Sequence, residues 1–342
     1  MSVKHKMKYG AALLATCMGL AVSTGVSAAK EAFKPLNDAE FEEAKSMYFQ
    51  RCAGCHGVLR AGATGKSLEP QPNKAKKSKG TLKLGTKRLT KIIKDGTEGG
   101  MNNFNDIFDD RQIDLLARYI QMEPPIPPEM PLSLMKERHK VYVDPKDYPT
   151  KPLHGRNWEN FFVVIERDAG KVAIIDGDTH EIVDHIDTGY AVHVIKAVEH
   201  HKTQHTPKGE PAGRFWYTQG RDGKMTKIDL WQKPGSMLVA ETQMAYDARD
   251  VAVSGDGKYV IGGGYWPPHF VILDAKTMEP LKVVSTRGID VDGNYVNEAR
   301  VAAIYTTPNE PTFWVAVKEL GQICLLYTSD AADDTHFVWV WG

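Results

Sequence analysis

Two hydrophobic patterns divide the chain. In the first third, apolar residues recur at the three- and four-residue spacing of amphipathic helices, whereas beyond about residue 158 they alternate with polar residues as in strands. A helix is predicted over residues 37–51, and Asn37 and Glu40 at its start have the spacing of a capping box. Its apolar face is formed by Phe41, Ala44 and Tyr48.

A second amphipathic helix is predicted over residues 110–121, starting at Asp109 or Asp110. Its apolar side is formed by Ile113, Leu116, Ala117 and Ile120. The proline-rich run at residues 124–128 ends this helix and starts a stiff linker.

The strand region repeats one unit, which consists of a strand, a tight glycine turn, a strand, a polar turn and a strand. An aspartate ends a strand in each unit, and these residues, Asp176, Asp229 and Asp274, lie 53 and 45 residues apart. A repeat of this length is typical of propeller blades, so a β-propeller is favoured over a sandwich. About three blades and part of a fourth are predicted, too few to close a ring.

The first 28 residues are typical of a secretory signal peptide. Lys4, Lys6 and Lys8 precede an apolar run at residues 11–22 and a small-residue cleavage site at residues 26–28. The apolar run is too short to remain as a membrane-spanning helix. A lipoprotein signal around Cys17 is the alternative.

A cysteine pair follows the first predicted helix, in the C-x-x-C-H sequence of Cys52, Cys55 and His56. This motif is the attachment signal of a c-type haem, in which each thiol adds to a porphyrin vinyl group and the histidine ligates the iron. A redox dithiol would lie near a βαβ pattern and a zinc site would need a second ligand pair, and the sequence shows neither. Two helices crossing over one haem are the core of a small cytochrome c domain.

Met101 is the predicted sixth ligand of this iron. It ends a glycine-rich loop at residues 96–101, between the haem motif and the second helix, where a loop can approach the haem edge closely. A packed core methionine is the alternative.

The overall composition adds three constraints. The chain has 342 residues, and its 43 Lys and Arg equal its 43 Asp and Glu, so the net charge indicates neither nucleic acid nor a membrane as partner. Its four cysteines are Cys17, Cys52, Cys55 and Cys324, which leaves no disulfide framework if Cys17 is removed and two cysteines carry haem. The basic residues 74–94 are interpreted as a solvated surface, with a docking face for an acidic electron donor as the alternative.

The sequence resembles cytochrome cd1 nitrite reductase from about residue 38 to residue 323. The segments that carry the resemblance are residues 48–60, 62–66, 187–193, 220–222, 264–268, 285–288 and 300–304. The resemblance implies an all-α cytochrome c domain at residues 29–125, a linker at 126–157 and, at 158–323, about four blades of an eight-bladed all-β propeller that holds haem d1.

The resemblance also implies the activity. It implies a periplasmic homodimer that takes electrons at haem c from a small cytochrome c or cupredoxin. The electrons pass to haem d1, where nitrite is reduced to nitric oxide. No membrane span is expected.

Several residues acquire roles only through this resemblance. His193 matches the proximal ligand of the haem d1 iron, whereas composition alone favours an ordinary strand histidine. Arg167, Arg221 and Arg249 match residues that face the haem d1 carboxylates, and Tyr265 matches an aromatic contact near the same pocket. Solvated blade-turn arginines and a propeller-core tyrosine are the alternatives, and Arg300 is a weaker candidate.

Three departures from the family pattern are expected to matter. The distal histidine pair that protonates nitrite belongs to the half of the propeller absent here, so no catalytic acid is visible and this chain alone is not expected to turn over. Residues 324–342, from Cys324 onward, are interpreted as a non-native tail of a gene fragment, with a divergent natural tail as the alternative. The segment at 199–211 carries His200, His201 and His205 and is interpreted as a polar insertion, with metal binding as the alternative.

Two further functions remain open at this stage. A relative with the same two domains oxidises the precursor of haem d1 and does not reduce nitrite. The other alternative is a c-type electron carrier whose propeller holds no second cofactor. The sequence does not determine the natural donor or the reduction potentials.

Overall fold

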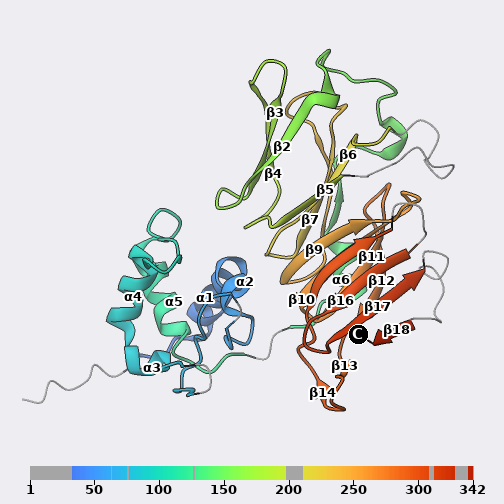
Figure 1. Ribbon diagram of the computed structural model, residues 1–342. Coiled ribbons are helices and arrows are strands. Elements are labelled where there is room, and N and C mark those ends of the chain that lie inside the picture. The colour runs from blue at the N-terminus through green and yellow to red at the C-terminus, as the bar shows by residue number, and fades with distance from the viewer. Residues whose placement is uncertain are drawn as a thin grey trace, which may run out of the picture. The chain divides into compact units, whose positions relative to one another are not determined.

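The computed structural model describes residues 33–62, 64–74, 77–125, 128–197, 211–307, 312–327 and 338–341. Helices come first along the chain and strands follow, as Figure 1 shows. The predicted signal peptide with Cys17 lies outside the described residues, as does the histidine-rich segment at 200–205.

Among the described residues, five helices form the N-terminal domain: α1 (Asp38–Arg51), α2 (Ala53–His56), α3 (Thr81–Leu84), α4 (Thr86–Asp95) and α5 (Asp110–Tyr119). Both predicted helices are confirmed as α1 and α5. Asn37 caps α1 and Asp109 caps α5, each in a complete capping box that satisfies two amide groups at the helix start.

Aromatic contacts hold α1 against α5. The ring of Tyr119 lies 5.3 Å from the ring of Phe41 and 5.7 Å from the ring of Tyr48, measured between centroids, and both tyrosines are fully buried. Such pairs add stabilisation beyond the apolar area that they bury. This crossing is the centre of the helical domain's core.

The basic segment at residues 74–94 contains α3 and α4, which the charge pattern alone did not predict. Leu89 and Ile93 on α4 are buried, whereas Lys87, Arg88 and Lys91 are exposed. The apolar stripe of this helix packs into the domain, and its cations face solvent.

In the part of the chain that the structure describes, the strands form four antiparallel sheets of three to five strands and one small hairpin. The first sheet contains β2 (Phe161–Glu166), β3 (Lys171–Asp176) and β4 (Ile182–Asp187). The second contains β5 (Val194–Ala197), β6 (Phe215–Gln219), β7 (Lys224–Asp229) and β8 (Leu238–Gln243), extended by β1 (His139–Val141).

The third sheet contains β9 (Asp247–Val253), β10 (Tyr259–Trp266), β11 (His269–Asp274) and β12 (Pro280–Ser285). The fourth contains β15 (Val301–Thr306), β16 (Thr312–Val317), β17 (Gln322–Tyr327) and β18 (Val338–Trp341), and the hairpin pairs β13 (Gly288–Ile289) with β14 (Tyr295–Val296). These sheets confirm the partial propeller, and among the described residues they do not close into a ring.

The repeated aspartates have a common structural reason. Asp176, Asp229 and Asp274 end β3, β7 and β11, and each carboxylate accepts a backbone N–H from the turn that follows. These donor–acceptor distances are 2.9, 3.0 and 2.7 Å respectively. An aspartate at this place satisfies the amide groups of a tight turn, so the blade repeat is visible as an aspartate repeat.

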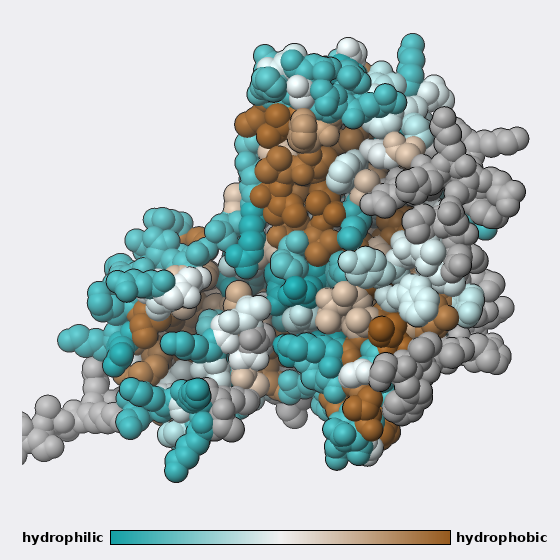
Figure 2. Space-filling model, in the orientation of Figure 1, coloured by the Kyte–Doolittle hydropathy of each residue, from teal (hydrophilic) through white to brown (hydrophobic). Residues whose placement is uncertain are grey.

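One face of the first sheet lacks a neighbour among the described residues. Figure 2 shows an apolar area over β2, β3 and β4. Phe162, Val164 and Ile182 of this sheet are 58, 42 and 58% exposed. Because propeller blades bury both faces against adjacent blades, this exposed face is consistent with the open arrangement of the sheets.

The predicted linker and the predicted tail both contain secondary structure. The segment between the domains contains α6 (Leu132–Glu137) and β1, and its Met130 and Met135 are buried in one core cluster with residues of the second and third sheets. Cys324 lies on β17 and is buried, while residues 328–337 lie outside the described residues. That residues from 324 onward are non-native stays a prediction.

Substitution of Asp229 tests the packing of the second sheet. Nε and Nη2 of Arg214 each lie 2.8 Å from a carboxylate oxygen of Asp229, and both residues are almost fully buried. Asp229→Asn leaves the guanidinium without its counter-charge, so we expect a loss of about 3–5 kcal/mol in the free energy of unfolding. Urea unfolding followed by tryptophan fluorescence measures it.

The control is Asp95→Asn, which breaks the exposed ion pair with Lys91. Its unfolding curve should superimpose on that of the wild type, because solvent-exposed pairs contribute little. Equal midpoints for Asp229→Asn and the wild type would show that the buried pair does not stabilise the sheet.

Candidate functional site

The C-x-x-C-H motif forms a single helical turn. Cys52 is the C-cap of α1 and the N-cap of α2, and its carbonyl accepts the N–H of His56 at 2.9 Å. Residues three apart in a helix share a face, so Cys52 and Cys55 present both thiols on the same side. Both cysteines are free and half-buried. The turn therefore fits two-point attachment of a porphyrin.

The imidazole of His56 is held by one nitrogen. Its Nδ1 lies 2.7 Å from the carbonyl oxygen of Lys66, so Nδ1 donates and Nε2 keeps its lone pair. Burial lowers the pKa of His56 from its ordinary value, against the opposing effect of this hydrogen bond. A Cβ on Gly65 would lie 2.9 Å from the ring, so glycine allows the close approach. A neutral, oriented imidazole is the form that ligates iron.

Met101 lies at the end of a short loop that folds back on itself. Its carbonyl accepts the N–H of Thr97 at 2.9 Å, and Gly96 has a φ of 74°, which favours glycine. Met101 and Cys52 both pack against the apolar cluster of the helical domain, which also contains Phe104. The structure thus brings the predicted sixth ligand and the attachment cysteine into one cluster.

His193 lies just before β5, and its backbone N–H donates to the carbonyl of Gln219 at 3.0 Å. Partial burial lowers the pKa of His193, and the charges of Arg249, Arg221 and Arg167 lower it further. These four residues come from three sheets and the turns beside them, yet they lie within electrostatic reach of one another. A histidine within the electrostatic influence of three arginines fits a ligand that carries carboxylates.

The three arginines differ in their surroundings. Arg221 is 6% exposed, donates to the carbonyls of Ala248 and Gly54, and lies near Asp247. Arg167 is exposed and lies 3.6 Å from Asp168, measured between charged atoms. Arg249 is half-buried, and no ion pair to its guanidinium is found within the described part of the chain.

Tyr265 connects this group to Arg300. The guanidinium carbons of Arg221 and Arg300 lie 4.7 and 5.1 Å from the centre of the buried Tyr265 ring. Arg300 is neutralised by Glu319, at 2.8 Å from its Nε. The tyrosine is therefore a stacking surface for two cations.

Sequence reasoning missed two carboxylates in this region. Asp247 is 2% exposed and lies 3.6 Å from Arg221, and burial raises its pKa to about 7 against the opposing charges of Arg221 and Arg300. Asp222 accepts the backbone N–H of Tyr190 at 2.8 Å, three residues before His193. The Gly-Arg-Asp segment at 220–222 was visible in the sequence, but nothing in it indicated these contacts.

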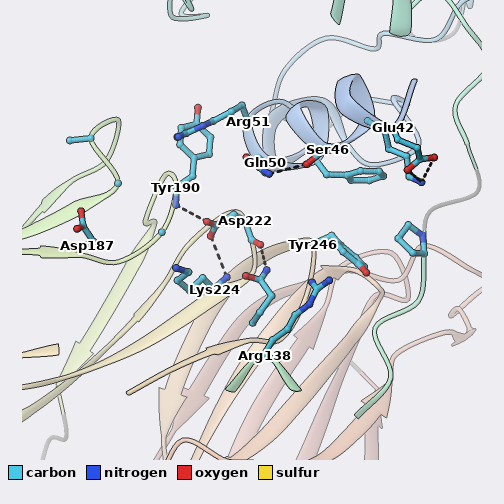
Figure 3. A pocket seen from close by; sticks show the side chains of 17 residues that line it. Glu42, Ser46, Gln50, Arg51, Arg138, Asp187, Tyr190, Asp222, Lys224 and Tyr246 are labelled. Atoms are coloured by element: carbon cyan, nitrogen blue, oxygen red, sulfur yellow. Dashed lines mark hydrogen bonds and ion pairs between the residues drawn. The ribbon is translucent and has the colours of Figure 1, made fainter. Parts of the chain in front are cut away.

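A cleft of about 740 Å³ lies beside this region. Figure 3 shows side chains of α1, among them Ser46 and Gln50, across from Tyr190, Asp222 and Tyr246. Neither His193 nor the predicted haem c ligands line it, so it is distinct from both groups described above.

Comparison with known families gives the class of protein. Residues 39–120 match the family described as cytochrome C oxidase, cbb3-type, subunit III, and residues 156–338 match the cytochrome D1 heme domain. The second match covers more than half of the chain, which therefore belongs to the cytochrome d1 haem domain family, preceded by a cytochrome c domain. Its cofactors are haem c and haem d1, which confirms the prediction from sequence.

The chain is also similar to two individual proteins of this kind. The chain is 47% identical to a nitrite reductase of Stutzerimonas stutzeri over 315 residues, which are 90% of this chain and 54% of the relative. It is 30% identical to a dihydro-heme d1 dehydrogenase of Pseudomonas aeruginosa over 280 residues, 82% of this chain and 51% of the relative. The chain thus spans about half the length of these relatives.

A solved structure of dihydro-heme d1 dehydrogenase NirN in complex with DHE is also similar. It has a TM-score of 0.57 and 27% sequence identity, and the match covers 87% of this chain and 59% of that structure. The roles of individual residues toward each haem stay predictions. Among the described residues, no helix is long and apolar enough to cross a membrane.

The raised pKa of Asp247 predicts a pH-dependent stability. Between about pH 4 and pH 7 the folded chain holds a proton on Asp247 that the unfolded chain has released. The free energy of unfolding contributed by this residue is therefore complete below that window and is lost as pH rises through it. Relative to Asp247→Asn, the wild type should lose on the order of a few kcal/mol across the window.

Urea unfolding of both proteins at intervals between about pH 5 and pH 8 measures this loss. Asp168→Asn, at an exposed position, should follow the wild type at every pH. A constant difference between Asp247→Asn and the wild type would contradict the prediction.

Proposed function

We propose that this chain carries the haem c domain and part of the haem d1 propeller of a periplasmic nitrite reductase that forms nitric oxide. The observation that carries the proposal is the 47% identity to a nitrite reductase, which exceeds the 30% identity to a dihydro-heme d1 dehydrogenase. The arrangement of three arginines about His193 supports it.

The proposal assigns haem c to the helical domain. Cys52 and Cys55 form the thioether bonds, His56 ligates the iron through Nε2, and Met101 supplies the second axial ligand. The hydrogen bond from Nδ1 of His56 to Lys66 supports this assignment because it fixes the ring orientation. Electrons enter here from a small periplasmic donor of the cytochrome c or cupredoxin type.

Haem d1 is assigned to the strand domain. His193 ligates its iron, Arg167, Arg221 and Arg249 face its carboxylates, and Tyr265 contacts the same pocket. Reduction of nitrite to nitric oxide and water consumes one electron and two protons. The resemblance assigns proton delivery to a histidine pair in the part of the propeller that this chain does not span, and the whole protein to a homodimer.

A haem d1 maturation dehydrogenase is the second candidate. It is favoured by the structural similarity to dihydro-heme d1 dehydrogenase over 87% of this chain. The third alternative, an electron carrier without a second cofactor, is disfavoured by the match of residues 156–338 to the cytochrome d1 haem domain.

Loss of the attachment cysteines tests the haem c assignment. We expect Cys52→Ser with Cys55→Ser to abolish haem that survives denaturing electrophoresis, because only thioether bonds resist denaturation. Cys324→Ala, at a buried cysteine on β17, should retain it. Haem retained by the double variant would refute the assignment.

The activity is tested with the full-length gene, read from the source DNA past codon 323. The purified protein, supplied with a reduced small cytochrome c, should form nitric oxide from nitrite, as measured with a nitric oxide electrode. His193→Ala should abolish this activity and leave the haem c spectrum unchanged, whereas His185→Ala, at an exposed site on β4, should be fully active.

The same preparation distinguishes the second candidate. Oxidation of dihydro-haem d1 without nitric oxide formation would establish the maturation enzyme in place of the reductase. A continuation of the gene that carries blades without the distal histidine pair would point to the same conclusion.

A further inference from the structure

Arg60 is the largest fully buried side chain among the described residues. It follows the haem motif by four residues and has a φ of 58°, a left-handed conformation that glycine adopts far more readily. A bulky residue in this conformation carries a backbone cost of roughly 1 kcal/mol. Arginine therefore occupies this position at a cost in backbone energy.

The contacts of Arg60 use only part of its guanidinium. Nη1 donates to the carbonyls of Tyr119 and Met122 at 3.0 and 2.6 Å, near the end of α5. The guanidinium carbon lies 4.1 Å from the centre of the Tyr119 ring and 5.4 Å from that of Tyr48. Nε and Nη2 are buried without an acceptor in the described part of the chain.

Arg60 differs in this respect from the other buried arginines. Four arginines are buried in the described residues. Arg118 pairs with Asp114 at 2.8 Å, Arg214 with Asp229 at 2.8 Å and Arg221 with Asp247 at 3.6 Å. No such carboxylate partner of Arg60 is found among the described residues. Its charge is uncompensated in a region of low dielectric constant, where Coulomb interactions are strong.

Arg60 lies next to the haem motif in the fold. Its backbone N–H donates to the carbonyl of Gly57 at 3.0 Å, and the same carbonyl accepts the hydroxyl of Tyr48 at 2.7 Å. Burial raises the pKa of the Cys52 thiol to about 12, and the charge of Arg60 opposes that rise. Gly57 follows His56, so the backbone of Arg60 is hydrogen-bonded to the segment that the proposed function attaches to haem c. Arginine does not lose its proton in proteins, so its charge is constant with pH.

We infer that Arg60 is a fixed, buried positive charge that raises the reduction potential of haem c. Uptake of an electron adds negative charge to the haem, and a nearby buried cation stabilises the reduced state more than the oxidised state. The inference rests on the proposed attachment of haem c to Cys52 and Cys55. In this proposal Arg60 acts on the reduction potential through its charge and does not ligate the iron.

The test is a potentiometric titration of haem c in the intact holoprotein. Arg60→Met removes the charge and keeps a long side chain, Arg60→Gln removes it and keeps an amide donor for the two carbonyls, and Arg60→Lys retains it. We expect the equilibrium constant for electron uptake from a redox mediator to fall roughly tenfold in the two neutral variants. Arg60→Lys should recover most of the wild-type value.

Arg111→Met is the matched control, because it removes one positive charge from an exposed pair with Glu43 in the same domain. Its equilibrium constant should stay within about twofold of the wild-type value, since solvent screens exposed charges. Thermal unfolding of each holoprotein records structural damage separately.

Each outcome decides the inference. A fall confined to the neutral variants supports it, and Arg60→Gln provides the measurement if Arg60→Met does not fold. An equal fall in Arg60→Lys and the neutral variants would show a purely structural role and overturn it, as would unchanged constants in all three. Absence of covalent haem from the wild type would instead refute the proposed function.

Discussion

The burial of charge is the constraint on which this structure depends. A guanidinium or carboxylate removed from water costs several kcal/mol unless a partner or a set of hydrogen bonds compensates it. Asp229 shows the compensated case, since Arg214, the N–H of Trp231 and the amide of Gln232 all donate to it. Ion pairs and hydrogen bonds of this kind connect the strand ends to the turns of the second sheet.

The same constraint marks the places where a ligand acts. The charges of Arg249 and Arg167 lower the pKa of His193, and neither arginine is paired with a buried carboxylate in the described residues. Arg60 lies in the helical core with two nitrogens that meet no acceptor there. A buried charge without a paired carboxylate, as at Arg60, costs stability, and such perturbed groups cluster at functional sites. The roles proposed here are anion recognition near His193 and electron affinity near Cys52.

Much of the fold could be predicted because its signals are local. The capping residues Asn37 and Asp109 mark the helix starts, and the aspartates that end β3, β7 and β11 reveal the blade period. The helix α4 escaped prediction because its cations obscure the stripe formed by Leu89 and Ile93. The addition of β1 to the second sheet escaped because pairing with β8 is a contact about a hundred residues distant, as between His139 and Thr242.

Only those residues of the candidate site that belong to a recognisable sequence motif could be predicted. C-x-x-C-H is a local signal, and the resemblance supplied His193 and its arginines. The burial of Asp247 beside Arg221, and of Arg60 between Tyr48 and Tyr119, follows from packing between segments far apart in sequence. No composition or spacing carries such information, because the same residues are ordinary surface charges in most sequences.

The site near His193 is a property of several blades together. Arg167 lies on the turn after β2, Arg221 on the turn after β6 and Arg249 on β9, while His193 precedes β5. Each sheet contributes one or two of these groups, so a single blade presents an isolated cation and only adjacent blades present a binding surface. The proposed haem d1 pocket thus depends on the packing of neighbouring sheets, whereas the proposed haem c site is assembled within one helical turn and the loops around it. The two cofactors therefore place different demands on the fold: one needs a local motif, and the other needs the propeller.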